Sequence, residues 1–158
     1  MMKRMFLGAV TAIALTSAAG AQKSPLPYGS PVTLAQAKSI VAAAEQSARS
    51  RNFTMAFAIV EPSGELVLFH KMDGTQYGSD LVAREKARTA ARFKRSTKAF
   101  FDSIAGGRNA VLSLPGVVAI EGGTPIVING QIVGAIGVSG GSSEQDGEVA
   151  AAALIGLE

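Results

Sequence analysis

Apolar residues at helical spacing mark the first structured segment of the chain. Thr33 followed by Gln36 has the pattern of a capping box. Five apolar residues then recur every three or four positions, at Leu34, Ala37, Ile40, Val41 and Ala44. One face of an α-helix collects residues at this spacing. We therefore predict an amphipathic helix from about 34 to Arg49.

The next part of the chain predicts a hairpin and two helices. Runs rich in β-branched, aromatic and aliphatic residues span 55–61 and 66–71, with Pro62-Ser63-Gly64 between them. Ser79 or Asp80 can cap a helix with alanines at positions 83, 87, 90 and 91 on its inner face. A shorter helix is predicted from Thr97 to Ala105. The basic residues in and just after the helix that Ser79 or Asp80 caps are expected to be solvated: Arg84, Lys86, Arg88, Arg92, Lys94 and Arg95.

The C-terminal part predicts three strands and a last helix. The strands cover 117–121, 125–128 and 131–138, with turns at Gly122-Gly123 and at Asn129-Gly130. Ser143 or a neighbour can cap the helix, whose first turn holds Glu144 and Asp146. The element order α-β-β-α-α-β-β-β-α predicts an α+β domain, a five-stranded antiparallel sheet with helices packed against it.

The first 21 residues have the pattern of a cleavable secretory signal. Lys3 and Arg4 precede an apolar run, and Ala19-Gly20-Ala21 follows it. That run is shorter than the ~20 residues of a membrane-spanning helix. We expect a protein exported to the periplasm or the medium, without a membrane anchor after cleavage. Residues 22–31 contain three prolines and predict a flexible leader, and 32–158 form the domain.

Composition excludes several classes of function. The signal takes two of the 15 basic residues, which leaves 13 against 12 acidic ones, a net charge of about +1 that gives no case for nucleic acid. The chain has no cysteine, so disulfides, thiolate metal sites and thiol catalysis are excluded.

A single histidine limits the available chemistry. His70 lies near the end of the strand 66–71, and alternation places His70 and Met72 on the same face. Histidine and methionine are both axial ligands of haem iron. The alternative is a polar histidine at the rim of the sheet.

Two carboxylates and one glycine-rich turn are further candidates. Asp73 and Asp146 can act as an acid and base pair if the fold brings them together, or they can satisfy a turn and a helix N-terminus. Amides before the last helix offer a candidate site for a small anion, at Gly140, Gly141, Ser142 and Ser143. The glycines match neither the dinucleotide-binding nor the P-loop pattern.

Several phrases in order resemble one family. They are Ala58-Ile59-Val60-Glu61, F-H-K-M-D-G at 69–74, K-A-R-T-A-A-R-F at 86–93, Gly122-Gly123-Thr124-Pro125-Ile126, the segment 134–141 and Gln145-Asp146. Together they are similar to the GlcG/HbpS family of haem-binding and haem-degrading-type proteins. The resemblance implies a profilin-like fold, a homo-oligomer, and haem as the ligand of some members. Members that bind haem use a histidine near the start of the first helix, where this chain has Thr33-Leu34-Ala35-Gln36.

Three functions therefore stay open at the level of sequence. The first is an exported haem or tetrapyrrole binder in haem sensing or iron protection, with His70 as iron ligand and Met72 beside it. The second is a small-molecule enzyme that uses Asp73 and Asp146. The third is an oligomeric module that binds a partner protein without ligand chemistry. The resemblance favours binding over catalysis.

Overall fold

The computed structural model describes residues 25–157, so the predicted signal and the residues 22–24 lie outside the described part. Four strands form one antiparallel sheet in the order β2-β1-β4-β3. Their bounds are β1 Ala56–Val60, β2 Leu66–Lys71, β3 Gly123–Ile128 and β4 Gln131–Ser139. The helices are α1 Leu34–Ser50, α2 Ser79–Phe93, α3 Thr97–Ala105 and α4 Ser143–Ala152, with a 3-10 turn, η1, at Asn109–Ser113.

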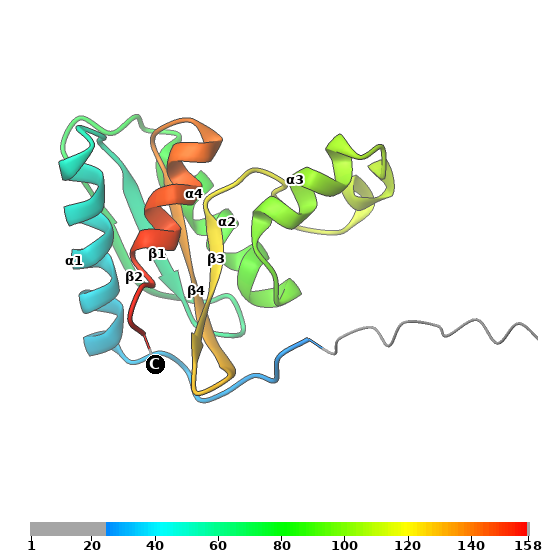
Figure 1. The fold of residues 1–158 in the computed structure, drawn as a ribbon, viewed down its shortest axis with the longest axis horizontal. Helices are drawn as coiled ribbons and strands as arrows, with labels where there is room; N and C mark the ends of the chain where they lie inside the picture. Colours follow the sequence, from blue (N-terminus) through cyan, green and yellow to red (C-terminus); the bar gives the residue numbers. More distant parts are fainter. Residues whose placement is uncertain (1–24, 158) are drawn as a thin grey trace, which may run out of the picture.

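The sheet separates two cores of different character. On one face, α1 and α4 cover large residues such as Phe57, Ile59 and Ile136. On the other face, the alanines of α2 pack on Ala56, Ala58 and Ala135. The alanines thus form the inner face of α2, as predicted, and small side chains on both surfaces let this helix approach the sheet closely. Figure 1 shows α3 and η1 extending away from this three-layer body.

The prediction of an α+β fold with an antiparallel sheet is confirmed, but the prediction of five strands is wrong. The run 117–121 is not a strand, because 117–119 have no regular secondary structure and 120–121 form a bend. Its backbone is attached to α2 instead, because Val118 N donates to Thr89 Oγ1 at 3.0 Å and that hydroxyl donates to the Gly116 carbonyl at 3.1 Å. The observed order is therefore α-β-β-α-α-β-β-α.

The described part of the predicted leader is mostly exposed and contains no helix or strand, but hydrogen bonds attach it to the domain. Ile132 N donates to the carbonyl of Pro27, and Gly29 N donates to the carbonyl of Ile132, both at 2.9 Å. The Tyr28 hydroxyl donates to the carbonyl of Ala91 at 2.8 Å, and Lys94 Nζ lies 4.0 Å from the centre of the Tyr28 ring. The leader thus pairs with β4 at the point where β1 has already ended (Figure 1). Through Tyr28 it also contacts the C-terminal end of α2.

Candidate functional site

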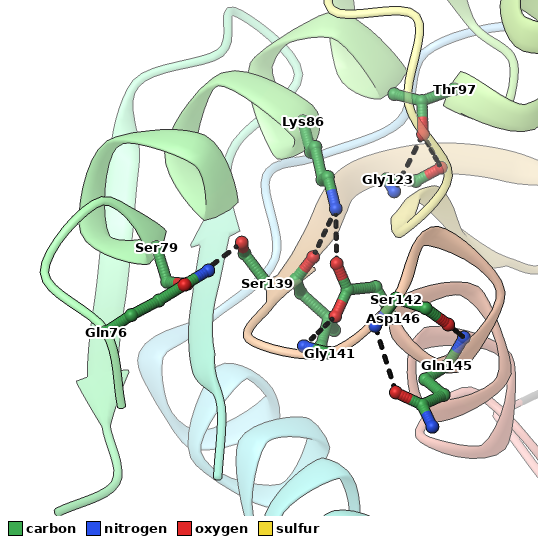
Figure 2. Close-up of polar contacts among 11 residues, drawn as sticks. Gln76, Ser79, Lys86, Thr97, Gly123, Ser139, Gly141, Ser142, Gln145 and Asp146 are labelled. Carbon is green, nitrogen blue, oxygen red and sulfur yellow. Dashed lines mark hydrogen bonds and ion pairs between the residues drawn. The ribbon is translucent and has the colours of Figure 1, made fainter. Parts of the chain in front are cut away.

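A buried ion pair lies where α2, β4 and α4 meet. Lys86 Nζ is 2.6 Å from Asp146 Oδ2 and donates also to the Val138 carbonyl at 3.1 Å. The two side chains are only 1% and 4% exposed. Figure 2 shows the lysine reaching from α2 to the N-terminal turn of α4. The prediction of a solvated Lys86 is therefore wrong.

The position of Lys86 in the sequence already indicates that it is buried. Lys86 is three positions after Ala83 and four before Ala90, which is the spacing of the buried face of α2. A charge on that face requires a partner, because an isolated buried ammonium is strongly disfavoured. The sequence could not identify Asp146 as that partner.

The carboxyl group of Asp146 is held on both oxygens. Oδ2 contacts Lys86, and Oδ1 accepts the backbone N–H of Gly141 at 2.9 Å. Burial raises the pKa of Asp146 above its ordinary value, while the Lys86 ammonium and the amides of Gly141 and Gly140 act in the opposite direction. Asp146 therefore organises the turn between β4 and α4.

Glycines make room for this cluster. A side chain on Gly122 would lie 2.9 Å from Asp146 Cβ and 3.0 Å from Lys86 Nζ, and one on Gly123 would overlap the Lys86 carbonyl. Thr97 Oγ1 accepts the N–H of Gly123 at 2.9 Å. The glycine-rich phrase before β3 thus serves close packing of backbone against α2 and α3.

Asp73 does not join Asp146. It is an exposed residue in the loop between β2 and α2, and it lines a cavity of about 440 Å³ formed by residues 71–77. Among residues 25–157, the carboxyl group of Asp146 contacts Lys86 and the amides of Gly141 and Gly140, and no hydrogen bond joins it to Asp73. The geometry does not support an acid and base pair, since Asp146 is buried and both of its carboxyl oxygens already have hydrogen-bond partners.

The amides proposed for a small anion are largely engaged. Ser142 N donates to Gln145 Oε1 at 2.9 Å, and Gln145 N donates back to Ser142 Oγ at 3.3 Å, a capping box (Figure 2). The amide of Gly141 is held by Asp146. Gly140 has a φ of 156° and lies against the carbonyl of Thr54. An anion at 140–143 would compete with the protein's own oxygens.

His70 lies on the outer strand of the sheet against α1. Its ring stacks on Phe57 with centroids 6.0 Å apart, and Nε2 lies 3.1 Å from Glu45 Oε2. The imidazole is 40% exposed, so a ligand can reach it. His70 fits the role of a single axial ligand provided that the ring turns away from Glu45.

Met72 does not fit as the second ligand. It is 6% exposed and packs in the core with α1, on the face that also carries His70, as alternation predicted. Two axial ligands must reach the iron from opposite faces of the porphyrin. A macrocycle standing between His70 and Met72 would have to displace α1, which already contacts His70 through Glu45. We therefore retain His70 alone as a candidate ligand.

No group of three or more His, Asp or Glu side chains that could hold a metal ion is found among the described residues. Within 25–157, none of the helices is long and apolar enough to cross a membrane.

A four-stranded antiparallel sheet between helical layers, joined by one buried ion pair, defines a small α+β domain. Residues 32–155 match the family model described as "Haem degrading protein HbpS-like", and the chain belongs to this family.

Three relatives illustrate the match. Protein GlcG of Escherichia coli strain K12 is 38% identical over 103 residues, which are 65% of this chain and 77% of GlcG. The crystal structure of Klebsiella pneumoniae protein ORFY has a TM-score of 0.74 at 31% identity, over 84% of this chain and 93% of that one. The crystal structure of a PduOC–haem complex has a TM-score of 0.72 at 26% identity, over 81% and 97%.

Proposed function

We propose that this protein binds haem, or a closely related tetrapyrrole, through His70. The observation that carries the proposal is the similarity to a domain solved as a haem complex, with nearly all of that domain covered. The family match over residues 32–155 supports the same ligand class.

His70, the residue that would hold the group, is on the outer strand β2 beside α1. Haem supplies an iron with open axial positions, and the imidazole of His70 supplies one nitrogen donor. The ring of Phe57 stacks on the imidazole. Glu45 competes for Nε2, so binding requires this contact to break. Among the described residues, His70 would be the protein ligand of the iron, and another copy of the chain could supply a second ligand.

Absorption spectroscopy tests the proposal. Titration of the wild type with haem should give a saturable Soret band, and His70→Ala should shift the band and weaken binding at least tenfold. Met72→Leu is the matched control, because it conserves volume in the core and should leave band and affinity unchanged. The absence of a band in the wild type would overturn haem binding. An unchanged band in His70→Ala would overturn the ligand assignment.

We further propose that the protein acts after export, in haem sensing or iron protection. The pattern of the first 21 residues supports secretion, and their removal would leave a chain that begins at Gln22. The leader residues that bond to β4 lie within 27–32, after this cleavage point, so cleavage would leave their hydrogen bonds intact.

We infer that copies of the chain assemble through the α3–η1 extension. Four large apolar residues on or beside it are between 39% and 67% exposed: Phe101, Leu112, Leu114 and Ile120. Clustered exposed apolar residues mark contact surfaces. Light scattering at micromolar concentration should give a mass above the monomer, and Leu112→Asp should lower it. A monomeric wild type would contradict this assembly.

A further inference from the structure

A cavity of about 310 Å³ lies away from His70 and from the buried ion pair. Its wall is shared by the leader, the start of α1 and the β3–β4 hairpin. Figure 1 shows the leader passing the turn of that hairpin before it enters α1. Five neutral polar residues contribute to the lining: Ser30, Thr33, Gln36, Asn129 and Gln131. Apolar residues, among them Ile128 and Val133, complete it.

The fold holds these walls in place. Val32 N donates to the carbonyl of Val133 at 2.8 Å, which joins the leader to β4. Asn129 has a φ of 50°, in the left-handed region that its Asn-Gly turn requires. A side chain on Gly29 would lie 2.9 Å from both Cβ and Oε1 of Gln131, so the glycine leaves the space that Gln131 occupies. The cavity is therefore built by tertiary contacts.

Hydrogen bonding leaves several of the lining groups available. Gln36 Oε1 accepts both the N–H and the hydroxyl of Thr33 at 2.9 Å, which fixes the amide and leaves its nitrogen without a partner among residues 25–157. The side chains of Ser30, Asn129 and Gln131 likewise form no hydrogen bond with the described residues. These carboxamides and hydroxyls can each serve a ligand.

The lining selects a chemical class. No side chain in it is charged, so a carboxylate or phosphate would lose hydration without gaining an ion pair. Carboxamides present donors and acceptors side by side, which matches adjacent hydroxyl groups that also donate and accept. The aliphatic wall suits the C–H face of a saturated ring. The volume is at the lower end of the range for ligand pockets, about 300–1,000 Å³, which fits one ring.

We infer that this cavity binds a neutral polyhydroxylated ring, a monosaccharide or a cyclitol. The site is separate from the proposed haem ligand and does not depend on it. Gln36 and Gln131 would donate to ring hydroxyls, and Asn129 would contact the same ring from the hairpin turn.

Ligand-observed NMR tests this with the protein expressed from the full 158-residue chain. Saturation-transfer difference spectra with D-glucose and with myo-inositol should show saturable binding at millimolar concentration. Gluconate and uracil serve as a charged and a planar comparison, and both should bind at least tenfold more weakly. Equal binding of either comparison compound would overturn the assigned class.

Variants locate the site. Gln36→Glu keeps the acceptor for Thr33 but replaces the free amide nitrogen by a charged oxygen, and should weaken binding about tenfold. Gln145→Glu is the matched control, because it makes the same change in the other capping box and should leave affinity unchanged. Asn129→Gly removes only the carboxamide and keeps the turn, with an expected loss of about threefold to tenfold.

Two further results would overturn the inference. One is the absence of saturable binding of both ring compounds to a folded wild type. The other is unchanged affinity in both Gln36→Glu and Asn129→Gly, since binding would then occur elsewhere on the protein. Thermal unfolding followed by circular dichroism shows that each variant is folded.

Discussion

Lys86 Nζ lies 2.6 Å from Asp146 Oδ2, although the two residues are 60 positions apart in the chain. The pair joins the helix that covers one face of the sheet to the helix that covers the other. Because both side chains are almost fully buried, each charge needs the opposite charge of its partner to compensate for lost hydration.

Breaking this pair should be costly. Lys86→Met leaves the Asp146 carboxylate buried without its cation, and should lower the free energy of unfolding by about 3–5 kcal/mol in urea denaturation. The double variant Lys86→Met/Asp146→Leu should recover most of the loss, since no charge is then buried.

The exposed pair of Lys98 and Asp102 provides the control. Their charged atoms are 2.8 Å apart, but both side chains are 55% exposed. Lys98→Met should therefore change the free energy of unfolding by less than about 1 kcal/mol. Equal effects of Lys86→Met and Lys98→Met would contradict the role assigned to burial.

The stability contributed by Asp146 should depend on pH. Its pKa is raised in the folded protein, chiefly by burial, so the folded state binds this proton more tightly than the unfolded chain does. The contribution is full below the ordinary pKa near 3.8 and is lost as the pH rises through the raised pKa. The wild type should thus lose stability relative to Asp146→Asn as the pH rises through that window. Urea titrations at several pH values measure the difference, and a gain instead of a loss would show a lowered pKa.

Tyr28 should stabilise the domain from outside its core. Tyr28→Phe removes the hydrogen bonds to the carbonyls of Ala91 and Arg92, at 2.8 and 3.2 Å, and should cost about 1 kcal/mol. Tyr77→Phe is the control, because Tyr77 is 91% exposed and should tolerate the change. If both variants unfold at the same urea concentration as the wild type, the leader does not contribute through Tyr28.

Gly137 should be intolerant of a side chain. A Cβ atom there would overlap the carbonyl oxygen of Ala83 in α2, which forces helix and sheet apart. We expect Gly137→Ala to lower the free energy of unfolding by about 3 kcal/mol. Gly78→Ala is the matched control, since no atom lies within 4 Å of its added Cβ and its φ is −62°. Similar stability of both variants in thermal unfolding would contradict this account.

Signal cleavage can be measured directly. Intact mass of the exported protein should correspond to a chain that begins at Gln22, because Ala19 and Ala21 place small residues where signal peptidase requires them. An exported product that retains the first 21 residues would contradict the prediction.

Local patterns predicted most of the elements. The strand 66–71 and the helix 97–105 have the predicted bounds, and the capping box at Thr33 and Gln36 is present in both directions. These features depend on periodicity and on bonds within a few residues, which a sequence contains. The family phrases likewise led to the family that the chain belongs to.

Features that depend on contacts between distant parts of the chain could be seen only in the tertiary structure. The run 117–121 has strand-like residues, yet its backbone bonds to Thr89 on α2, and no local pattern indicates that partner. The leader joins β4 because β1 ends early and leaves backbone groups to pair. Asp146 was visible in the sequence as a helix N-terminal carboxylate, and Lys86 as one basic residue among six. Only the fold brings these two residues together. Each buried charge is compensated by the other, and that contact joins distant parts of the chain, which no local sequence pattern indicates.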